Sequence, residues 1–592
     1  MRRCSRRPGP ARWSLALLLL LPAFAHAGVK LTVDGVDDPL KAAVTAGVSL
    51  SQYASREVSD AQIRRLYERA SDEARTALQP YGYYDATVTG QLRRDGNDWQ
   101  VTLHVKPGEP VKVNTVDIKL DRDALAIPSI RAAARRIERL RGHRLDDATY
   151  DADRDALSSA LTAEGFLDAK MKVHRVEVNP PAHTAAIRLA WDAGTRYRYG
   201  QVKFEGSQFR PGFLQRYVPF KRGDYFDQSQ LLGLQQALTG ADYFSVVNVL
   251  PDVDKASHGS VDITVQLVPA KRTIYTGGPF IGTDTGFGMR GGIERRWVNN
   301  RGHKWKNELV LAQRLKTLST LYSIPMPGPD QRSLNFGANF RDANTDTSKS
   351  RTLELVGNDS RLWHGWVRTV GVHALIGTFT VGQGGNLADT APGVEHGRSE
   401  LVFGEASLTR KHADNPDFVR RGWSLELYAR STAGSLLSTT RFSQLQANAK
   451  WIRGFTRRDR LILRGSVGTT WTGNFSALPP QLRFFAGGDR SVRGYAFQSI
   501  GPENSYGRVI GGRNLLVSSA TVEHYFTHAW GMAAFVDAGN AFSGTRYSPR
   551  IGAGLGVRWR SPVGLIRVDF GFPVHDRTHH GMELHIVIGP DL

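Results

Sequence analysis

The stretch RFFAGGDRSVRGYAFQ, residues 483–498, places arginines in a glycine-rich segment between two predicted β-strands. Arg493 could bind carboxylates strongly, because the planar guanidinium group donates in a fixed fork and can serve two carboxylates at once. Two acids follow it: Glu523 alternates with apolar residues in SSATVEHYF, and Asp537 does so in AAFVDAGNAF. Since successive strand residues point to opposite faces, both acids are predicted to face one interior. We therefore expect Arg493 to lie between Glu523 and Asp537.

The loop that carries Arg493, residues 472–513, is the longest connection in the C-terminal half of the chain. Gly494 permits a tight backbone beside the arginine, and Tyr495 can pack on an inner wall. This combination predicts an internal strut, in which the loop folds inward and is tied to the wall by ion pairs. The alternative is an external loop whose arginine faces solvent.

The elements that would hold this strut are strands, which dominate the sequence from about residue 271 onward. In RIGAGLGVRW (550–559), apolar residues alternate with Gly and Arg, and in GLIRVDFGF (564–572) they oppose Arg567 and Asp569. We count sixteen such runs, at about 20 residues for each strand and turn, which suits membrane strands of about 10 residues. Residues 271–592 are thus predicted to form an all-β, 16-stranded antiparallel transmembrane β-barrel. A soluble β-sandwich, whose strands also alternate, is the alternative.

The N-terminal half mixes helical and strand periods and repeats itself. GYYDATV (82–88), GFLDAKM (165–171) and DYFSVVN (242–248) each follow a predicted helix and open a strand. Repetition at a period of roughly 80 residues indicates tandem units of one kind. We expect three small α+β domains, and their limits are 28–108, 109–195 and 196–270.

The N-terminus reads MRRCSRRPGPARWSLALLLLLPAFAHAGVK, with arginines before a short apolar run and small residues after it. That pattern predicts a secretory signal peptide over 1–27; a membrane anchor is the alternative. The single cysteine, Cys4, lies inside this segment. The net charge of +21 fits anionic lipid headgroups or a solvated surface, and export argues against nucleic acid as a partner.

Motifs for enzymatic chemistry are missing from the sequence. It contains no GxSxG, HExxH or GxxxxGK[ST] pattern, and its one GxGxxG, beginning at Gly286, lies in a predicted strand rather than a strand-to-helix turn. The 17 histidines show no metal-ligand spacing, and His579 and His580 are expected in a solvated turn. We expect no enzymatic activity, no cofactor and no metal.

The first and last predicted strands contain residues that weaken pairing. The first strand contains Gly277, Gly278 and Pro279, and the last strand is short and ends at Gly589-Pro590. Proline lacks the amide that a ladder needs, and glycine weakens strands. The pair should therefore form a weak lateral seam, whose exposed edges could template new strands. A closed barrel with a merely short seam is the alternative.

The ordered motifs VRGY, GGRNLLVSSATVEHYF, FVDAGNAF and GLGVRWRSPVGLIRVDFGFP resemble those of the outer-membrane barrel-assembly and two-partner-secretion superfamily. YRYGQVKFEGSQF and the segment after it are similar to its POTRA domains. Three such units, the form FFAGGDRSVRGY and the ending GPDL most resemble the TamA family, the outer-membrane subunit of the translocation and assembly module.

The resemblance implies that Arg493 contacts Glu523 and Asp537, and that the seam acts as a gate in the outer membrane of a Gram-negative bacterium. It also implies POTRA domains in the periplasm that dock a TamB-like, periplasm-spanning partner anchored in the inner membrane. Unfolded outer-membrane proteins, autotransporters among them, are the implied clients, with outer-membrane lipids as a further partner. A secretion pore for a dedicated passenger, a passive channel, and the outer-membrane end of a lipid-transport bridge are the alternatives.

Overall fold

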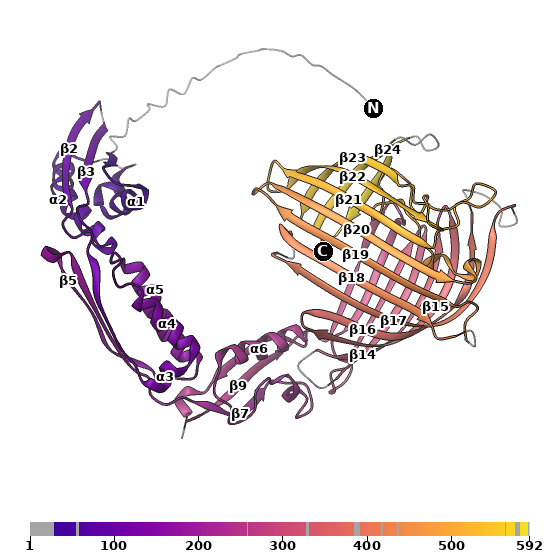
Figure 1. Cartoon of the computed structure of the whole chain (residues 1–592), viewed down its shortest axis with the longest axis horizontal. Coiled ribbons are helices and arrows are strands. Elements are labelled where there is room, and N and C mark those ends of the chain that lie inside the picture. The colour runs from indigo at the N-terminus through magenta and orange to yellow at the C-terminus, as the bar shows by residue number, and fades with distance from the viewer. Residues whose placement is uncertain are drawn as a thin grey trace, which may run out of the picture. The chain divides into compact units, whose positions relative to one another are not determined.

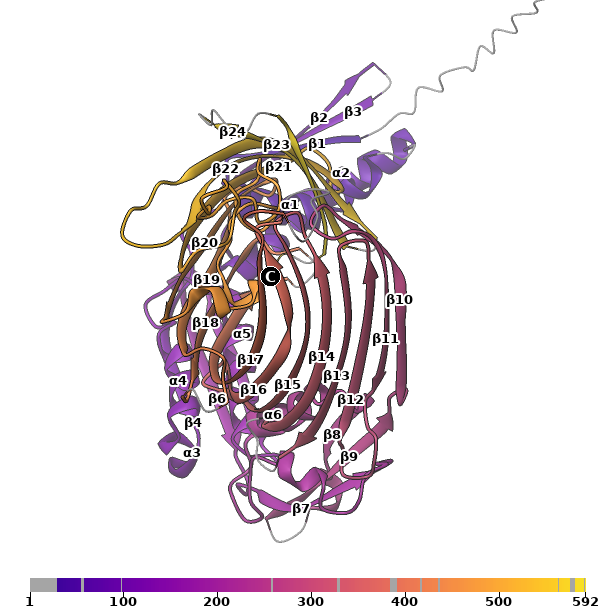
Figure 2. The same ribbon diagram turned by 90° about the vertical axis from the view of Figure 1, so that its right-hand side faces the viewer.

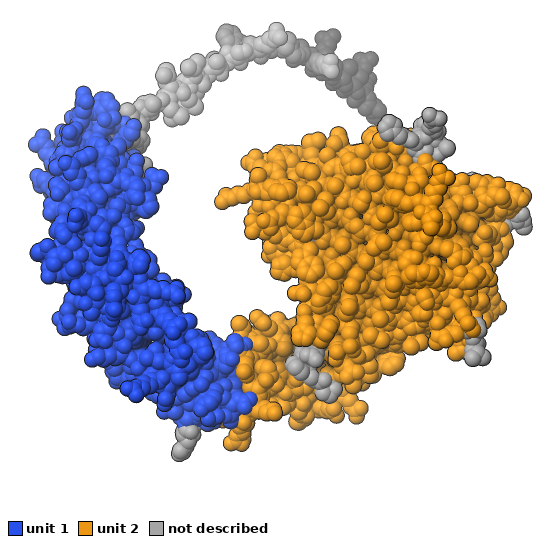
Figure 3. All heavy atoms as spheres, in the orientation of Figure 1, with its two compact units in different colours: residues 1–199, 223–229, 255–261 blue, residues 200–222, 230–254, 262–592 orange. Residues whose placement is uncertain are grey.

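The computed structural model describes residues 29–54, 58–96, 98–256, 259–326, 331–383, 391–415, 418–434, 437–562, 564–574, 581–589 and 591. The predicted signal peptide, His579, His580 and Pro590 lie outside this part of the chain. Two compact units divide the molecule (Figure 3). The first comprises Met1–Tyr199, Gly223–Ser229 and Lys255–Val261, and the second Gly200–Arg222, Gln230–Asp254 and Asp262–Leu592.

The first repeat is a three-stranded sheet of order β1-β3-β2 with two α-helices. Helix α2 begins after Ser59, whose hydroxyl accepts a hydrogen bond from the backbone N–H of Gln62, and it buries an apolar stripe that includes Ile63 and Leu78. The elements are β1 (Val29–Asp34), α1 (Asp38–Gly47), η1 (Ser49–Tyr53), α2 (Asp60–Leu78), η2 (Gln79–Tyr81), β2 (Thr87–Asp95) and β3 (Asp98–Lys106).

The second repeat has the sheet order β4-β6-β5, and α4 and α5 run side by side along it (Figure 1). Its elements are β4 (Lys112–Lys119), α3 (Arg122–Ala126), α4 (Pro128–Glu138), α5 (Asp147–Ala163), β5 (Lys170–Asn179), η3 (Pro180–Ala182) and β6 (Thr184–Asp192). The third has the order β7-β9-β8. Its elements are β7 (Arg198–Glu205), η4 (Leu214–Tyr217), α6 (Gln228–Gly240), β8 (Phe244–Pro251), η5 (Val253–Lys255) and β9 (Ser260–Pro269).

The C-terminal part is a 16-stranded sheet in which every strand pairs antiparallel with its sequence neighbours, in the order β10 to β25 (Figure 2). The predicted fold class, α+β repeats before a 16-stranded antiparallel barrel, is confirmed. The strands are β10 (Thr273–Gly282), β11 (Gly286–Arg295), β12 (Lys304–Ala312), β13 (Leu315–Pro325), β14 (Ser333–Asn344), β15 (Ser348–Trp363), β16 (Trp366–Val381), β17 (Glu395–Ala413), β18 (Arg421–Thr432), β19 (Phe442–Gly454), β20 (Asp459–Thr472), β21 (Asn514–Tyr525), β22 (Trp530–Phe542), β23 (Arg550–Ser561), β24 (Gly564–Val574) and β25 (Glu583–Ile588).

Burial alternates along these strands as the sequence pattern predicts. On β22, Phe535 and Asp537 are buried while Met532 and Val536 are exposed, so one face of the wall is apolar and exposed and the other is covered from inside. Among the described residues, no helix has the length and apolarity to cross a membrane.

One end of the barrel carries the parts of the third repeat that belong to the second unit, within 200–222, 230–254 and 262–270. The hydroxyl of Tyr243 donates to the carbonyl of Gly302, in the turn between β11 and β12, at 2.6 Å, and burial raises the pKa of Tyr243. Arg296 pairs with Asp242 at 2.8 Å. We call this the proximal end. Since neighbouring strands are antiparallel, the turns that follow every second strand from β11 onward lie at it, including the β15–β16 turn.

The first and last strands form the seam. Strand β10, with Gly277, Gly278 and Pro279, pairs along its whole length with β11. In the described part of the chain no ladder joins β10 to β25, which has only six residues and is followed by Gly589. Among the described residues, one hydrogen bond crosses the seam, from the backbone N–H of Ile586 on β25 to the hydroxyl of Thr283, the residue that follows β10, at 2.9 Å. The two edges are thus held far more weakly than any other neighbouring pair.

Replacement of Gly302 by alanine should loosen the third repeat from the barrel. Gly302 has φ +75°, and a Cβ there would overlap the ring of Phe213. We expect Gly302→Ala to speed limited proteolysis of residues 200–272 severalfold. Gly212→Ala is the matched control, since Gly212 has φ +80° and open space around its Cβ position. Equal cleavage of both variants would show that backbone strain, not this contact, decides the result.

Candidate functional site

The loop between β20 and β21 is folded into the barrel and packed against its inner wall. It includes η6 (Phe475–Ala477) and η7 (Pro480–Leu482), and it pairs with itself, as in the hydrogen bond from Phe484 N–H to the Gly512 carbonyl at 3.0 Å. Tyr495 is 2% exposed. Two apolar clusters join the loop to the wall. The first comprises Phe484, Ala486, Val492, Tyr495, Ile500, Leu515, Val517 and Ala541. The second comprises Leu478 and Leu482 of the loop with Leu375, Leu401, Phe403 and Phe442 of the wall.

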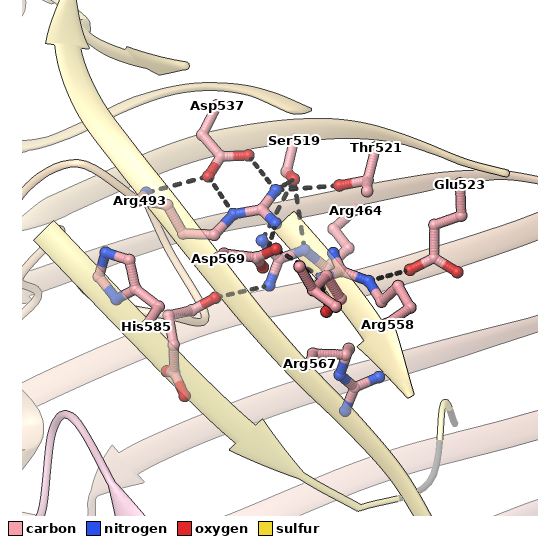
Figure 4. A network of polar contacts seen from close by, with 12 residues as sticks. Arg464, Arg493, Ser519, Thr521, Glu523, Asp537, Arg558, Arg567, Asp569 and His585 are labelled. Atoms are coloured by element: carbon pink, nitrogen blue, oxygen red, sulfur yellow. Dashed lines mark hydrogen bonds and ion pairs between the residues drawn. The ribbon is translucent and has the colours of Figure 1, made fainter. Parts of the chain in front are cut away.

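Arg493 sits at the inner end of this loop with all its donor nitrogens bonded (Figure 4). Its Nε and Nη2 donate to the two carboxylate oxygens of Asp537 at 2.7 and 2.8 Å, and its backbone N–H also donates to Asp537, at 2.9 Å. Nη1 donates to Asp569 at 2.9 Å, and Nη2 also reaches Thr521 at 2.9 Å. The guanidinium carbon lies 3.6 Å from the ring centre of Phe535. The fork therefore binds two carboxylates, as its chemistry allows.

The second carboxylate is not the predicted one. Asp537 is opposite Ser519 in the β21–β22 register, and Glu523 lies four residues beyond Ser519, about 13 Å along the strand. Glu523 is fully buried there and accepts hydrogen bonds from Arg460 and Arg558 instead. Asp569 on β24 takes its place at Arg493. Alternation put Asp569 on the inner face, but which inner acid meets the loop depends on how far each strand is staggered.

Glycines on β23 and β24 make room for the loop backbone. A Cβ at Gly552 would overlap the carbonyl oxygen of Arg493, and a Cβ at Gly571 would overlap the N–H of Gly494. Gly494 itself has φ +97°, a region that disfavours side chains, and its N–H donates to His585 Nε2 at 3.2 Å. The loop thus also contacts β25, the last strand.

The ion pairs continue from Arg493 to the C-terminus as an alternating series. Arg558 bridges Asp569 and Glu523, with both contacts at 2.6 Å. Arg460 bridges Glu523, at 2.7 Å, and Asp591, at 2.6 Å. Arg567 contacts Asp591 at 3.2 Å, and the Lys450 ammonium donates to the Asp591 carbonyl. We call this series the lumen ion-pair chain: Asp537, Arg493, Asp569, Arg558, Glu523, Arg460, Asp591 and Arg567.

Sequence reasoning missed most of the residues in the lumen ion-pair chain. Arg558, Arg567 and Asp569 carried a usable signal, since each interrupts a strand at an inward position where water or a partner must satisfy the charge. Asp591 carried none, because it follows the last strand and has no periodic neighbour. The lumen ion-pair chain links the loop, five strands and Asp591 in one buried network.

Comparison with known proteins identifies the parts of this architecture. Residues 298–590 match the family model described as the Omp85 superfamily domain. The barrel belongs to the Omp85 superfamily. Residues 30–107 match a model described as POTRA domain TamA domain 1, and residues 197–270 match a POTRA model described as the surface antigen variable number repeat. The Omp85 barrel is therefore preceded by POTRA domains.

Two individual proteins resemble the chain over most of its length. The outer membrane protein assembly factor BamA of Nitratidesulfovibrio vulgaris is 22% identical over 543 residues, which cover 86% of this chain and 66%, just under two thirds, of that relative. The crystal structure of Haemophilus ducreyi BamA lacking POTRA domains 1–3 superposes with a TM-score of 0.65 and 16% identity, covering 80% of this chain and 98% of that one. At 16% identity, the similarity to the Haemophilus ducreyi structure is a similarity of fold.

Double-mutant cycles on the free energy of unfolding should distinguish Asp537 and Asp569, which contact Arg493, from Glu523, which was predicted to contact it and does not. Arg493→Ala leaves Asp537 and Asp569 buried without their cation, which should cost about 3–5 kcal/mol. Coupling of Arg493→Ala with Asp537→Asn or Asp569→Asn should exceed about 1 kcal/mol, while coupling with Glu523→Gln should be smaller. The measurement is denaturant unfolding of the purified barrel in detergent. Equal coupling to all three acids would contradict the geometry.

Loss of the Asp591 carboxylate should release the last strand. Asp591→Asn weakens the contacts with Arg460 and Arg567 that hold the chain end inside the barrel. We expect amides of residues 583–588 to exchange with deuterium at least tenfold faster, while those of β21 and β22 keep their rates. Glu583→Gln, on the same strand, is the control. Unchanged exchange in Asp591→Asn would mean that the ion pairs do not hold β25.

Proposed function

We propose that this protein is an outer-membrane assembly factor of the TamA type, which promotes insertion or translocation of autotransporters and other β-barrel proteins. In this proposal the barrel lies in the outer membrane of a Gram-negative bacterium, with the POTRA domains in the periplasm. The Omp85 and TamA-type POTRA matches support it, and so does the BamA relative. We propose a non-enzymatic role, and the members of the lumen ion-pair chain are bonded to one another.

The observation that carries the proposal is the unpaired seam. Strands β10 and β25 are the two ends of the sheet order, and no ladder joins them in the described part of the chain. Strand edges of this kind add further strands by β-augmentation. An incoming strand could pair with β10 while β25 moves aside. Only one hydrogen bond between Ile586 and Thr283 would need to break in the described part of the seam, so the opening costs little.

The lumen ion-pair chain fits a barrel that must open without collapsing. Arg493 ties the loop to β21, β22 and β24, and β24 is the strand that pairs with β25. At the same time the lumen ion-pair chain reaches the chain end through Asp591. The strands beside the seam are thus held in place by buried ion pairs, although no backbone ladder crosses the seam in the described part of the chain.

Partner docking is the second half of the proposal. A TamB-like protein that spans the periplasm would bind the POTRA domains and bring client chains to the seam. The sheets of the repeats, each with two edge strands, offer the same mode of strand addition. The loop packed within the lumen makes an open diffusion channel the weaker alternative.

A covalent lock across the seam should abolish insertion. The variant Thr283→Cys with Ile586→Cys, joined by a short bis-maleimide, connects the two edges, and the rest of the mature chain has no thiol. We expect the uncrosslinked variant in lipid vesicles to accelerate folding of an unfolded autotransporter barrel at least tenfold over empty vesicles. The crosslinked form should lose this acceleration.

The matched control joins a seam that is already paired. Tyr275 and Ile293 are opposite one another on β10 and β11, and both are exposed on the outer face. Tyr275→Cys with Ile293→Cys, crosslinked in the same way, should keep full acceleration. If the β10–β25 crosslink leaves folding as fast as this control, the seam is not the route and the proposal is wrong.

A further inference from the structure

The outer wall of the barrel is hollowed on the side opposite the seam. Strands β16 to β20, which lie side by side in Figure 1, line an apolar groove of about 530 Å³. Its floor consists of small outward residues, Ala406, Ala429 and Ala447, on three successive strands. Its walls consist of larger apolar residues: Val370, Leu408, Leu427, Leu445 and Val467. We call this the alanine groove.

The alanine groove follows from the cross-strand pairs of its lining. Ala406 stands opposite Ala429, and Ala447 stands opposite Leu427 on one side and Val467 on the other. Val467 and Leu445 are 51% and 49% exposed beside it. A volume within about 300–1,000 Å³ is typical of binding sites for small molecules. The shape therefore suits one elongated apolar ligand better than a smooth wall would.

Arginines gather where the groove meets the proximal end of the barrel. Arg368, which lines the groove, stands directly opposite Arg361 in the β15–β16 register. Like charges in opposite positions destabilise a sheet. The nearest acid, Asp359, is 2.7 Å from Arg332 and 3.8 Å from Arg368, so it balances one of three cations. Within the described residues, the buried Nε atoms of Arg361 and Arg368 have no hydrogen-bond partner.

A fourth arginine and three tryptophans complete this end of the site. Arg410 on β17 lies two residues beyond Leu408, which stands opposite Arg368. Diagonal neighbours of this kind are about 7–8 Å apart, so Arg410 lies near Arg368. Its guanidinium carbon is 5.8 Å from the Trp366 ring centre and 5.5 Å from that of Trp423. Trp363 is opposite Trp366. Tryptophan and arginine at such a level are typical of the membrane–water interface.

We propose that this surface is a binding site for an anionic phospholipid of the leaflet at the proximal end. The phosphate lies on Arg361, Arg368 and Arg410, whose planar groups bind phosphate oxygens in pairs. One acyl chain lies in the alanine groove. The site rests on the proposed function only in that the barrel spans a membrane.

Charge and position together select this ligand. The excess positive charge at Arg361 and Arg368 is relieved only by an anion, and the apolar groove begins directly at Arg368. A neutral lipid or a detergent would fill the groove and leave the arginines unbalanced. The groove strands, β16 to β20, lie in the middle of the sixteen-strand order, far from the seam. A bound lipid would therefore fix how deeply this side of the barrel sits in the membrane.

The test is native mass spectrometry of the full chain released from detergent, titrated with phosphatidylglycerol or phosphatidylethanolamine of equal chain length. We expect one phosphatidylglycerol to bind at least tenfold more tightly than phosphatidylethanolamine. Arg361→Gln with Arg368→Gln should remove this preference. Ala429→Leu with Ala447→Leu, which fills the floor, should weaken phosphatidylglycerol binding at least fivefold. Resistance of each barrel to unfolding in dodecyl sulfate reports that it is folded.

The matched control removes two outward arginines from the other end of the same wall. Arg351 on β15 and Arg398 on β17 both flank Thr378 and are paired with Asp342 and Glu400. Arg351→Gln with Arg398→Gln should keep the preference for phosphatidylglycerol. Equal binding of the two lipids, or equal loss in the control, would overturn the headgroup site. Unchanged binding by the filled groove would overturn the acyl-chain site.

Lipid binding and client insertion fail independently in this design. No client is present in the titration, and the crosslinked Thr283→Cys, Ile586→Cys form should bind phosphatidylglycerol as the unmodified chain does. An inactive insertase that retains the lipid preference would reject only the assembly role. A working insertase without the preference would reject only the lipid site.

Discussion

The fork of Arg493 on Asp537 and Asp569 is the interaction on which the shape of the barrel interior depends. The rest of the loop is held by two apolar clusters and by scattered hydrogen bonds to the wall, such as that from Gln444 to the Leu482 carbonyl. The two carboxylates are costly to bury alone, and so is the guanidinium; together, with Thr521 and the Phe535 ring, they leave few unsatisfied donors. Because none of the three charged groups is stable when buried alone, their pairing holds Arg493 and the loop backbone beside it at one depth in the barrel.

The glycines of β23 are a condition of that interaction. Gly552 stands opposite Asp537, and Gly556 stands opposite Asp569. A side chain at either position would fill the space that the Arg493 backbone or the Asp569 carboxylate occupies. Glycine weakens a strand, so β23 gives up intrinsic stability to let the loop approach, and the ion pairs offset that loss.

Local patterns in the sequence predicted the elements well, and distant contacts poorly. Alternation is a property of the strand itself, so it placed Asp537, Asp569 and Arg567 on the inner face without any knowledge of their neighbours. The choice between Glu523 and Asp569 as a partner of Arg493 depends on the stagger of four strands and on loop depth, which no local pattern encodes. Asp591 was beyond reach for the same reason, as was the contact between Tyr243 and Gly302, which joins segments 59 residues apart.

The burial of Asp591 has a practical consequence for anyone who handles this protein. Asp591 lies inside the barrel with its carboxylate held by Arg460 and Arg567, so a probe attached to this side chain would start in the lumen rather than in solution. Such a probe would displace buried arginines and would alter the state being measured. A label placed in a distal turn, such as the one between β12 and β13, would leave the Asp591 contacts undisturbed.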